Sequence, residues 1–145
     1  MDAVLDLLTG PHDVPRARAF VRRSLAGWGV DEVADEAELL TSELLANAVL
    51  HARPPYRLVV HQLAVAVRIE VWDSAPEILP VRRSRSSDAA TGRGLAVADT
   101  LSESWGVEIS IDGKQKGVWV ELALSRTMAP IPRQRAVEPS RPAPA

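Results

Sequence analysis

Glu43 and Asn47 are a carboxylate and an amide spaced so that they can act together. Residues four positions apart on a helix point the same way, because each residue turns the helix by about 100°. By the same geometry the pair lies about 60 to 100° from the middle of the segment's apolar face, at the border with solvent. This is where the wall of a cleft would lie. The alternative is an exposed glutamate with an asparagine near a helix end.

Asp73 ends a segment in which the inward residues of an expected strand are all aliphatic. A carboxylate at the mouth of a sheet accepts hydrogen bonds from an amino group. The alternative is that Asp73 starts the turn Asp-Ser-Ala-Pro, since aspartate often caps its own backbone in turns.

A glycine-containing turn follows Thr91 and leads into a helical pattern. It consists of Gly92, Arg93, Gly94 and Leu95. The free N–H groups and the positive end of a helix dipole favour an anion such as phosphate at this place. The alternative is plain helix capping by Thr91. The segment is neither a Walker A loop nor a dinucleotide fingerprint, because GxxxxGK[ST] is absent and no strand precedes it.

The remaining candidates for catalysis or metal binding are few. The chain has no cysteine, which excludes thiol catalysis, disulfides and cysteine-rich zinc sites. His12, His51 and His61 share no metal spacing, and His51 falls on the apolar face of its segment. We therefore expect His51 to be a core or cleft histidine.

Two helices precede the expected strands. Apolar residues at helical spacing predict a first helix from Asp13 to the stop at Gly27 and Gly29, and a second from Asp31 to Pro54. Asp13 and Asp31 are the expected N-caps.

The period then changes to two, which predicts strands. Leu5, Leu7 and Leu8 are compatible with a short first strand, and the clearer alternating segments are 57–61, 64–72, 107–111 and 118–124, with an Asp112-Gly113 turn. Between the second and third of these, an aperiodic Arg-rich segment from Asp73 to Thr91 is expected to be a functional loop. A third helix is expected from Thr91 to Trp105, ended by Gly106.

The fold class follows from the alternation of apolar and polar residues along the expected strands. Strands that alternate apolar with polar residues are covered on one side only. The sequence therefore predicts an α+β two-layer sandwich, with a mostly antiparallel mixed sheet and about three helices on one face. The order of the strands does not follow from the pattern.

Composition fits one domain of 145 residues, which we divide into a folded part at 1–124 and a Pro-rich disordered tail at 125–145. The net charge of -2 argues against broad capture of nucleic acid. No apolar run approaches the ~20 residues of a membrane span, and the opening segment lacks a basic region, so we expect no membrane contact and a cytoplasmic protein.

Taken together and in order, three boxes resemble the ATP-binding domain of the GHKL superfamily. They are ELLTSELLANAVLHA, the Val71-Trp72-Asp73 strand end, and TGRGLAVADTLSESWGV after the Arg-rich loop. Within that superfamily the chain, from about residue 14 to 124, is most similar to small bacterial anti-sigma-factor serine kinases.

The resemblance implies ATP and Mg²⁺ as cofactors. Asn47 would coordinate Mg²⁺ bound to the nucleotide phosphates, and Glu43 would act as general base or orient the attacking hydroxyl. Asp73 would accept the adenine amino group, and Ala75 would permit close approach. Phosphates would meet the turn formed by Gly92, Arg93, Gly94 and Leu95, and the Arg-rich segment would be the ATP lid.

The chain departs from the family pattern in three ways. Ser74 to Glu77 replace a box with two glycines. Gly117-Val118 stand where a hydroxyl near the adenine is usual. No phosphoacceptor-histidine helix pair is present, so we do not expect a two-component sensor kinase. Each absent contact removes about 0.5 to 1.5 kcal/mol of net binding.

Three functions follow as hypotheses. The first is a serine kinase that binds a sigma factor, phosphorylates a small anti-anti-sigma protein and forms a homodimer, as the resemblance implies. The second is a non-catalytic adaptor on the same fold with weak or no nucleotide binding. The third, a nucleic-acid binder using the Arg-rich loop, is poorly supported by the net charge and the 4% aromatic content.

Overall fold

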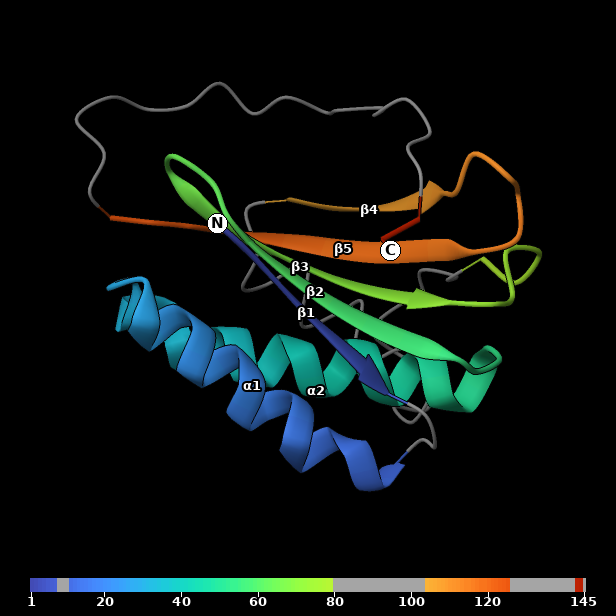
Figure 1. The fold of residues 1–145 in the computed structure, drawn as a ribbon, viewed down its shortest axis with the longest axis horizontal. Coiled ribbons are helices and arrows are strands. Elements are labelled where there is room, and N and C mark those ends of the chain that lie inside the picture. The colour runs from blue at the N-terminus through green and yellow to red at the C-terminus, as the bar shows by residue number, and fades with distance from the viewer. Residues whose placement is uncertain (8–10, 80–103, 126–142, 145) are drawn as a thin grey trace, which may run out of the picture.

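The computed structural model describes residues 1–7, 11–79, 104–125 and 143–144. Five strands form one antiparallel sheet in the order β1-β2-β3-β5-β4, and two helices lie against one face of it (Figure 1). The elements are β1 (Asp2–Leu7), α1 (Val14–Gly27), α2 (Ala34–His51), β2 (Tyr56–Gln62), β3 (Ala66–Asp73), β4 (Ser104–Ile109) and β5 (Lys116–Ala123). The predicted α+β two-layer sandwich is confirmed, with every described strand pair antiparallel.

The two helices occupy the segments that the apolar spacing predicts. In α1 the buried residues Ala17, Val21 and Leu25 recur at four-residue spacing, and Gly29 takes a positive φ of 71° just beyond the helix end. Asp13 is the N-cap residue of α1, as predicted, although it makes no side-chain cap hydrogen bond. The predicted cap Asp31 is wrong, because Asp31 begins a short 3-10 turn before α2 and Val33 is the N-cap residue of that helix.

His51 corrects another prediction, because it is exposed rather than in the core or a cleft. The buried residues of α2 end at Ala48. His51 lies almost one turn later, and the next residue, Ala52, is the one that packs against the core. Helical spacing alone does not show which residue of the last turn faces the core.

The inner face of the sheet is aliphatic, as the alternation predicts. The buried side chains that α1 and α2 cover include Leu58, Val60, Ile69, Val71, Val118 and Val120. In register, Ile69 of β3 pairs with Val120 of β5, and Val71 pairs with Val118. The core therefore lies between this face and the two helices.

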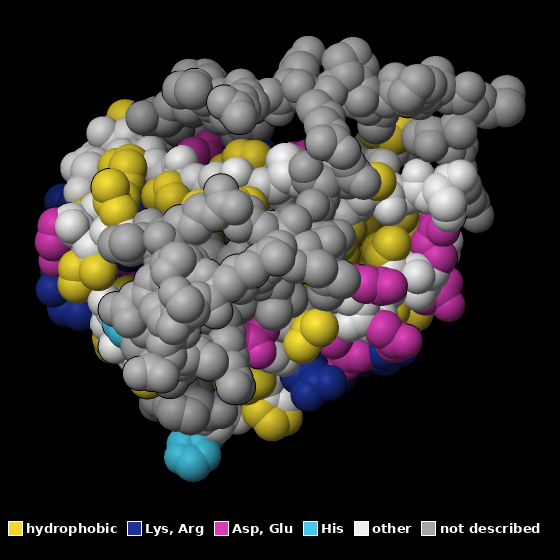
Figure 2. Space-filling model, turned by 180° about the vertical axis from the view of Figure 1, so that it is seen from behind, with side chains coloured by type: hydrophobic (Ala, Val, Ile, Leu, Met, Phe, Trp, Pro, Cys, Tyr) yellow, Lys and Arg dark blue, Asp and Glu magenta, His cyan; other side chains and the backbone are white. Residues whose placement is uncertain are grey.

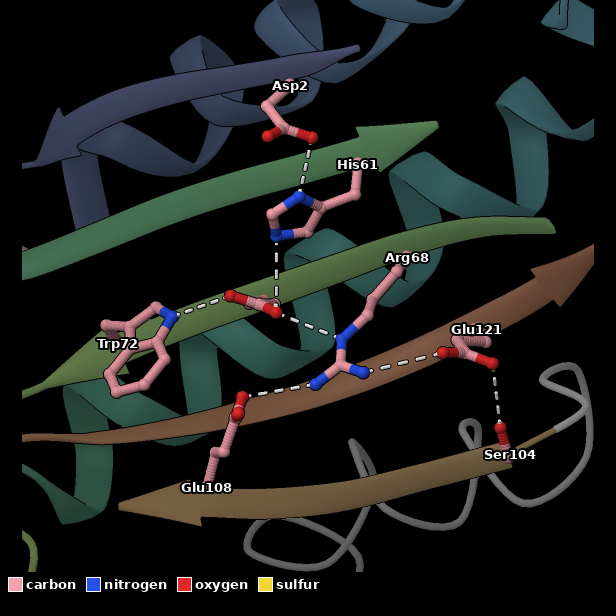
Figure 3. A network of polar contacts seen from close by, with 8 residues as sticks. Asp2, His61, Arg68, Trp72, Ser104, Glu108 and Glu121 are labelled. Carbon is pink, nitrogen blue, oxygen red and sulfur yellow. Dashed lines mark hydrogen bonds and ion pairs between the residues drawn. The ribbon is translucent and has the colours of Figure 1, made fainter. Parts of the chain in front are cut away.

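The outer face differs from the expectation of a solvated surface. Every residue of β3 is buried, including Arg68 and Glu70. The Arg68 guanidinium lies 2.9 Å from Glu70 and 3.1 Å from Glu108 (Figure 3). It also lies 4.2 Å from the centre of the Trp119 ring. Charges are tolerated there because they pair with one another and with an aromatic face.

Glycine and tryptophan pair across strands on this outer face. Gly106 is opposite Trp119, and Gly117 is opposite Trp72. A Cβ atom would lie 2.7 Å from the Trp119 ring at Gly106 and 2.5 Å from the Trp72 ring at Gly117. Each ring therefore packs directly on the backbone of the neighbouring strand.

This pairing corrects the predicted end of the third helix. Trp105 and Gly106 belong to β4, so Gly106 is a strand residue that makes room for a ring and not a helix stop. Ile111 lies outside β4 and is 67% exposed, in contrast to its predicted place on the strand face. The turn glycine Gly113 has a φ of 71°, which confirms the Asp112-Gly113 turn. The rest of the third helix lies outside the described residues.

Figure 2 shows exposed hydrophobic side chains at several separate places on the rear face. Large apolar residues at the described surface are Met1, Val4, Leu39, Leu50, Leu63, Ile78, Leu79 and Ile111. Among the described helices, none is long and apolar enough to cross a membrane. The division into 1–124 and a tail stays a prediction.

We predict that Gly117→Ala destabilises the fold by about 1 to 3 kcal/mol, because the new methyl group overlaps the buried Trp72 ring. Urea unfolding measures the effect. Gly27→Ala is the matched control, since a Cβ there meets nothing within 4 Å. This control should gain up to about 1 kcal/mol from helix propensity. Equal stability of G117A and the wild type would contradict the packing argument.

We predict a pH dependence of stability that comes from His61. Its Nδ1 lies 2.7 Å from Asp2 and its Nε2 lies 3.3 Å from Glu70. Hydrogen bonding to Glu70 first, and then to Asp2, raises the pKa of His61 against the opposing effect of burial. The stabilisation is therefore complete below the unfolded pKa of about 6.5 and is lost as the pH rises through the higher folded value.

Urea unfolding at a series of pH values tests this dependence. His61→Gln should remove the decline in unfolding free energy above about pH 6.5. His51→Gln, at an exposed position, should keep it. A decline of the same size in H61Q would assign the effect to other groups.

Candidate functional site

The end of α2 and the end of β3 meet at one edge of the sandwich. The Ser74 backbone N–H donates to the Arg53 carbonyl at 3.0 Å, which ties the segment after β3 to the segment after α2. Helix α2 also packs against β3, and its buried residues Leu40, Leu44 and Ala48 belong to the same core as the inward residues of that strand. The candidate residues on these two elements therefore belong to neighbouring parts of the fold.

Glu43 and Asn47 lie in the second half of α2, one turn apart and both half-buried. Leu44 and Leu45 between them are buried, which confirms that the pair lies at the border of the apolar face. Within the described residues, no hydrogen bond or ion pair engages either side chain. A carboxylate and an amide oxygen in this setting suit Mg²⁺, which takes few protein ligands and keeps water and phosphate oxygens.

Asp73 is the last residue of β3 and is 1% exposed. Its Oδ1 accepts a hydrogen bond from the Ala75 backbone N–H at 2.8 Å, so the turn interpretation of Asp-Ser-Ala-Pro is confirmed. Burial raises the pKa of Asp73, while the Ala75 N–H and the Lys116 ammonium act in the opposite direction. Adenine recognition by Asp73 stays a prediction.

Lys116 is a site residue that the sequence analysis missed. It is the first residue of β5 and pairs directly with Asp73 across the two strands. Its Nζ lies 3.0 Å from each Asp73 carboxylate oxygen and donates to the Ala75 carbonyl at 2.9 Å. With only 3% of the residue exposed, this is a buried ion pair.

The apolar–polar alternation of β3 and β5 contained a signal for the pair of Asp73 and Lys116. Lys116 is in phase with Val118 and Val120, and Asp73 is in phase with Val71 and Ile69. Both charges therefore stand at inward positions of strands that are otherwise aliphatic. An inward lysine needs a buried partner, and an inward aspartate is the natural one.

The rim of the site carries further charge. Exposed Arg53 and Glu77 form an ion pair. The pKa of Glu77 is lowered first by its own backbone N–H and then by Arg53. The pKa of buried Tyr56 is raised by burial and by the negative charge of Asp73. Tyr56 thus feels the charge of Asp73, and the charge of Glu77 in turn contributes to the raised pKa of Asp73.

Four predicted site residues lie outside the described residues, namely Gly92, Arg93, Gly94 and Leu95. The Arg-rich segment is described only up to Leu79. Ala75 is fully buried, and both its backbone N–H and its carbonyl are engaged, by Asp73 and by Lys116. In the described part, no group of three or more His, Cys, Asp or Glu side chains is arranged to hold a metal.

We predict that Lys116→Met destabilises the fold by about 3 to 5 kcal/mol, because it leaves a buried carboxylate without its charge partner. The double variant D73N/K116M should recover much of this loss, since no unpaired charge remains. Urea unfolding of both variants gives the coupling energy. Glu77→Gln, which breaks the exposed Arg53 pair, is the control and should change stability by less than about 1 kcal/mol. Strictly additive effects at Asp73 and Lys116 would contradict the ion pair.

Comparison with known proteins adds one clear finding. A family model described as "Histidine kinase-like ATPase domain" matches residues 9–124. Among solved structures, the Acinetobacter baumannii histidine kinase AdeS has a TM-score of 0.43 and 13% sequence identity, over 86% of this chain and 70% of that chain. At this level the structural similarity adds nothing to the family match. The search of curated proteins found no significant match.

Proposed function

Since the chain belongs to the histidine kinase-like ATPase domain family, we propose that it is a regulatory serine kinase of the anti-sigma-factor type. In this proposal it binds ATP with Mg²⁺, sequesters a sigma factor and phosphorylates a serine of a small anti-anti-sigma protein. The observation that carries the proposal is the pair Glu43 and Asn47, half-buried on α2 and engaged by no other described residue. A homodimer in the cytoplasm completes the proposal.

The two residues would divide the work at the phosphate end of the site. Asn47 would hold Mg²⁺ through its amide oxygen. Glu43, one turn away, would accept the proton of the attacking hydroxyl or orient it. Bound ATP supplies the phosphoryl group. Phosphoryl transfer depends mostly on positioning and on charge stabilisation, so few protein groups are needed.

The described residues fit the nucleotide unequally. At the phosphate end the donor set suits a hydrated magnesium ion. At the base end, Asp73 is buried and already paired with Lys116, and Ala75 is buried with both backbone polar groups engaged. This inequality supports a second candidate, a non-catalytic adaptor on the same fold that sequesters a partner protein.

We predict that Asn47→Ala abolishes Mg-ATP binding. The variant lacks the amide oxygen that would hold Mg²⁺, and among the described residues of this turn of α2 only Glu43 could also provide an oxygen ligand. Isothermal titration calorimetry measures it directly. Glu36→Ala is the matched control, at an exposed position near the start of the same helix, and should keep the wild-type affinity. Unchanged affinity of N47A would count decisively against this site.

We predict that Glu43→Gln keeps ATP affinity and lowers phosphoryl transfer by about 10² to 10⁴-fold, since the amide cannot take a proton. Labelled ATP with candidate partner proteins provides the measurement. Phosphate on a partner serine would eliminate the adaptor. Full binding of partners with no transfer by the wild type would favour it.

A further inference from the structure

We infer that Lys116 closes the base end of the nucleotide site, so that the protein holds nucleoside triphosphates by their phosphates and discriminates little among bases. The inference rests on the proposed function, because it concerns the same site. It identifies Lys116 as the residue that determines specificity there.

The acceptors that a purine amino group would need already have internal partners. Asp73 Oδ1 accepts hydrogen bonds from the Ala75 N–H and from Lys116, and Oδ2 lies 3.0 Å from the same ammonium. The Ala75 carbonyl accepts from Lys116 at 2.9 Å and from the Ile78 N–H at 3.0 Å. Asp73, Ala75 and Lys116 thus bind one another, with the Lys116 ammonium at the centre of the contacts.

The balance of interactions favours the internal partner. An amino group of a base is neutral, whereas Lys116 is charged and lies 3.0 Å from the carboxylate in a buried place. Separating a buried ion pair costs more than one hydrogen bond to a carboxylate returns. A base therefore gains little by competing with Lys116 for Asp73.

The lysine is also held in place by the sheet. Lys116 starts β5, which is paired with β3 on one side and β4 on the other. The next residue, Gly117, lies against the Trp72 ring. The pairing fixes the backbone of Lys116, and its buried ammonium can leave Asp73 only by giving up the 3.0 Å ion pair and the hydrogen bond to the Ala75 carbonyl.

The other end of the site has the opposite character. Glu43 and Asn47 are half-buried, and no other described residue engages them. Binding energy is therefore available from metal and phosphate contacts, which every nucleoside triphosphate shares. A site that is accessible to the phosphates but closed to the base should bind different nucleoside triphosphates with similar affinity.

Calorimetric titration of the full chain with ATP, GTP, CTP and UTP, each with Mg²⁺, tests the inference. We expect the wild-type affinities for the four triphosphates to agree within about threefold. In Lys116→Met, Asp73 loses its internal partner, and ATP should gain about tenfold or more over the other three. The matched control is Lys114→Met, an exposed lysine two residues earlier, which should leave all four affinities unchanged.

A second variant covers the case in which K116M does not fold. Asp73→Asn removes the carboxylate and keeps Lys116, and the four affinities should still agree with one another. A wild-type preference for ATP of tenfold or more would overturn the inference, as would a loss of ATP affinity alone in D73N or an unchanged profile in folded K116M.

The Asn47→Ala variant separates this inference from the proposed function. Triphosphate binding that depends on Asn47 but strongly favours adenine would overturn the inference alone. If no triphosphate binds in an Asn47-dependent way, the proposed function fails and this inference fails with it.

Discussion

The antiparallel pairing of β3 with β5 is the constraint on which the rest of the structure depends. One register sets Ile69 against Val120 in the core, Trp72 against Gly117 on the outer face, and Asp73 against Lys116 at the strand end. A shift by one residue would exchange the two faces, placing charges in the core and aliphatic side chains outside. The core, the ring packing and the ion pair therefore all specify the same register.

The two faces of this pairing meet different demands. Toward the helices, aliphatic side chains provide the hydrophobic stabilisation. On the other side, Arg68 forms ion pairs with Glu70 and Glu108, so that its charge is paired although it is buried (Figure 3). The guanidinium also lies over the ring of Trp119. Buried charges of this kind add little net stability, but they penalise any arrangement that leaves one unpaired.

The two ends of the candidate site differ in how accessible the packing leaves them. Helix α2 carries Glu43 and Asn47 at a border that the core leaves accessible. The end of β3, by contrast, is closed by a lysine from the neighbouring strand. Membership of the histidine kinase-like ATPase family speaks for nucleotide binding in general. In this chain, the surroundings of Glu43, Asn47 and Lys116 favour binding through the phosphates over binding through the base.

Local patterns determined much of this molecule. Helical spacing located α1 and α2, and period-two alternation located β2, β3 and β5 and the inward aliphatic face, because burial on one side selects residue types at the period of each element. The four-residue spacing of Glu43 and Asn47 placed them on one side of α2 for the same reason. The turn at Asp73 also follows from local chemistry, since the carboxylate reaches a backbone N–H two residues later.

Contacts between distant segments decided the rest. Gly106 resembles a helix stop in isolation, and only the ring of Trp119 on the adjacent strand explains a glycine inside β4. His51 keeps the helical phase of the core but is exposed, while the next residue, Ala52, packs against the core. Asp73 and Lys116 are separated by 43 positions, and their ion pair exists only because β3 and β5 are neighbours. Strand order and register arise from the packing of the whole sheet, so no local pattern contains them.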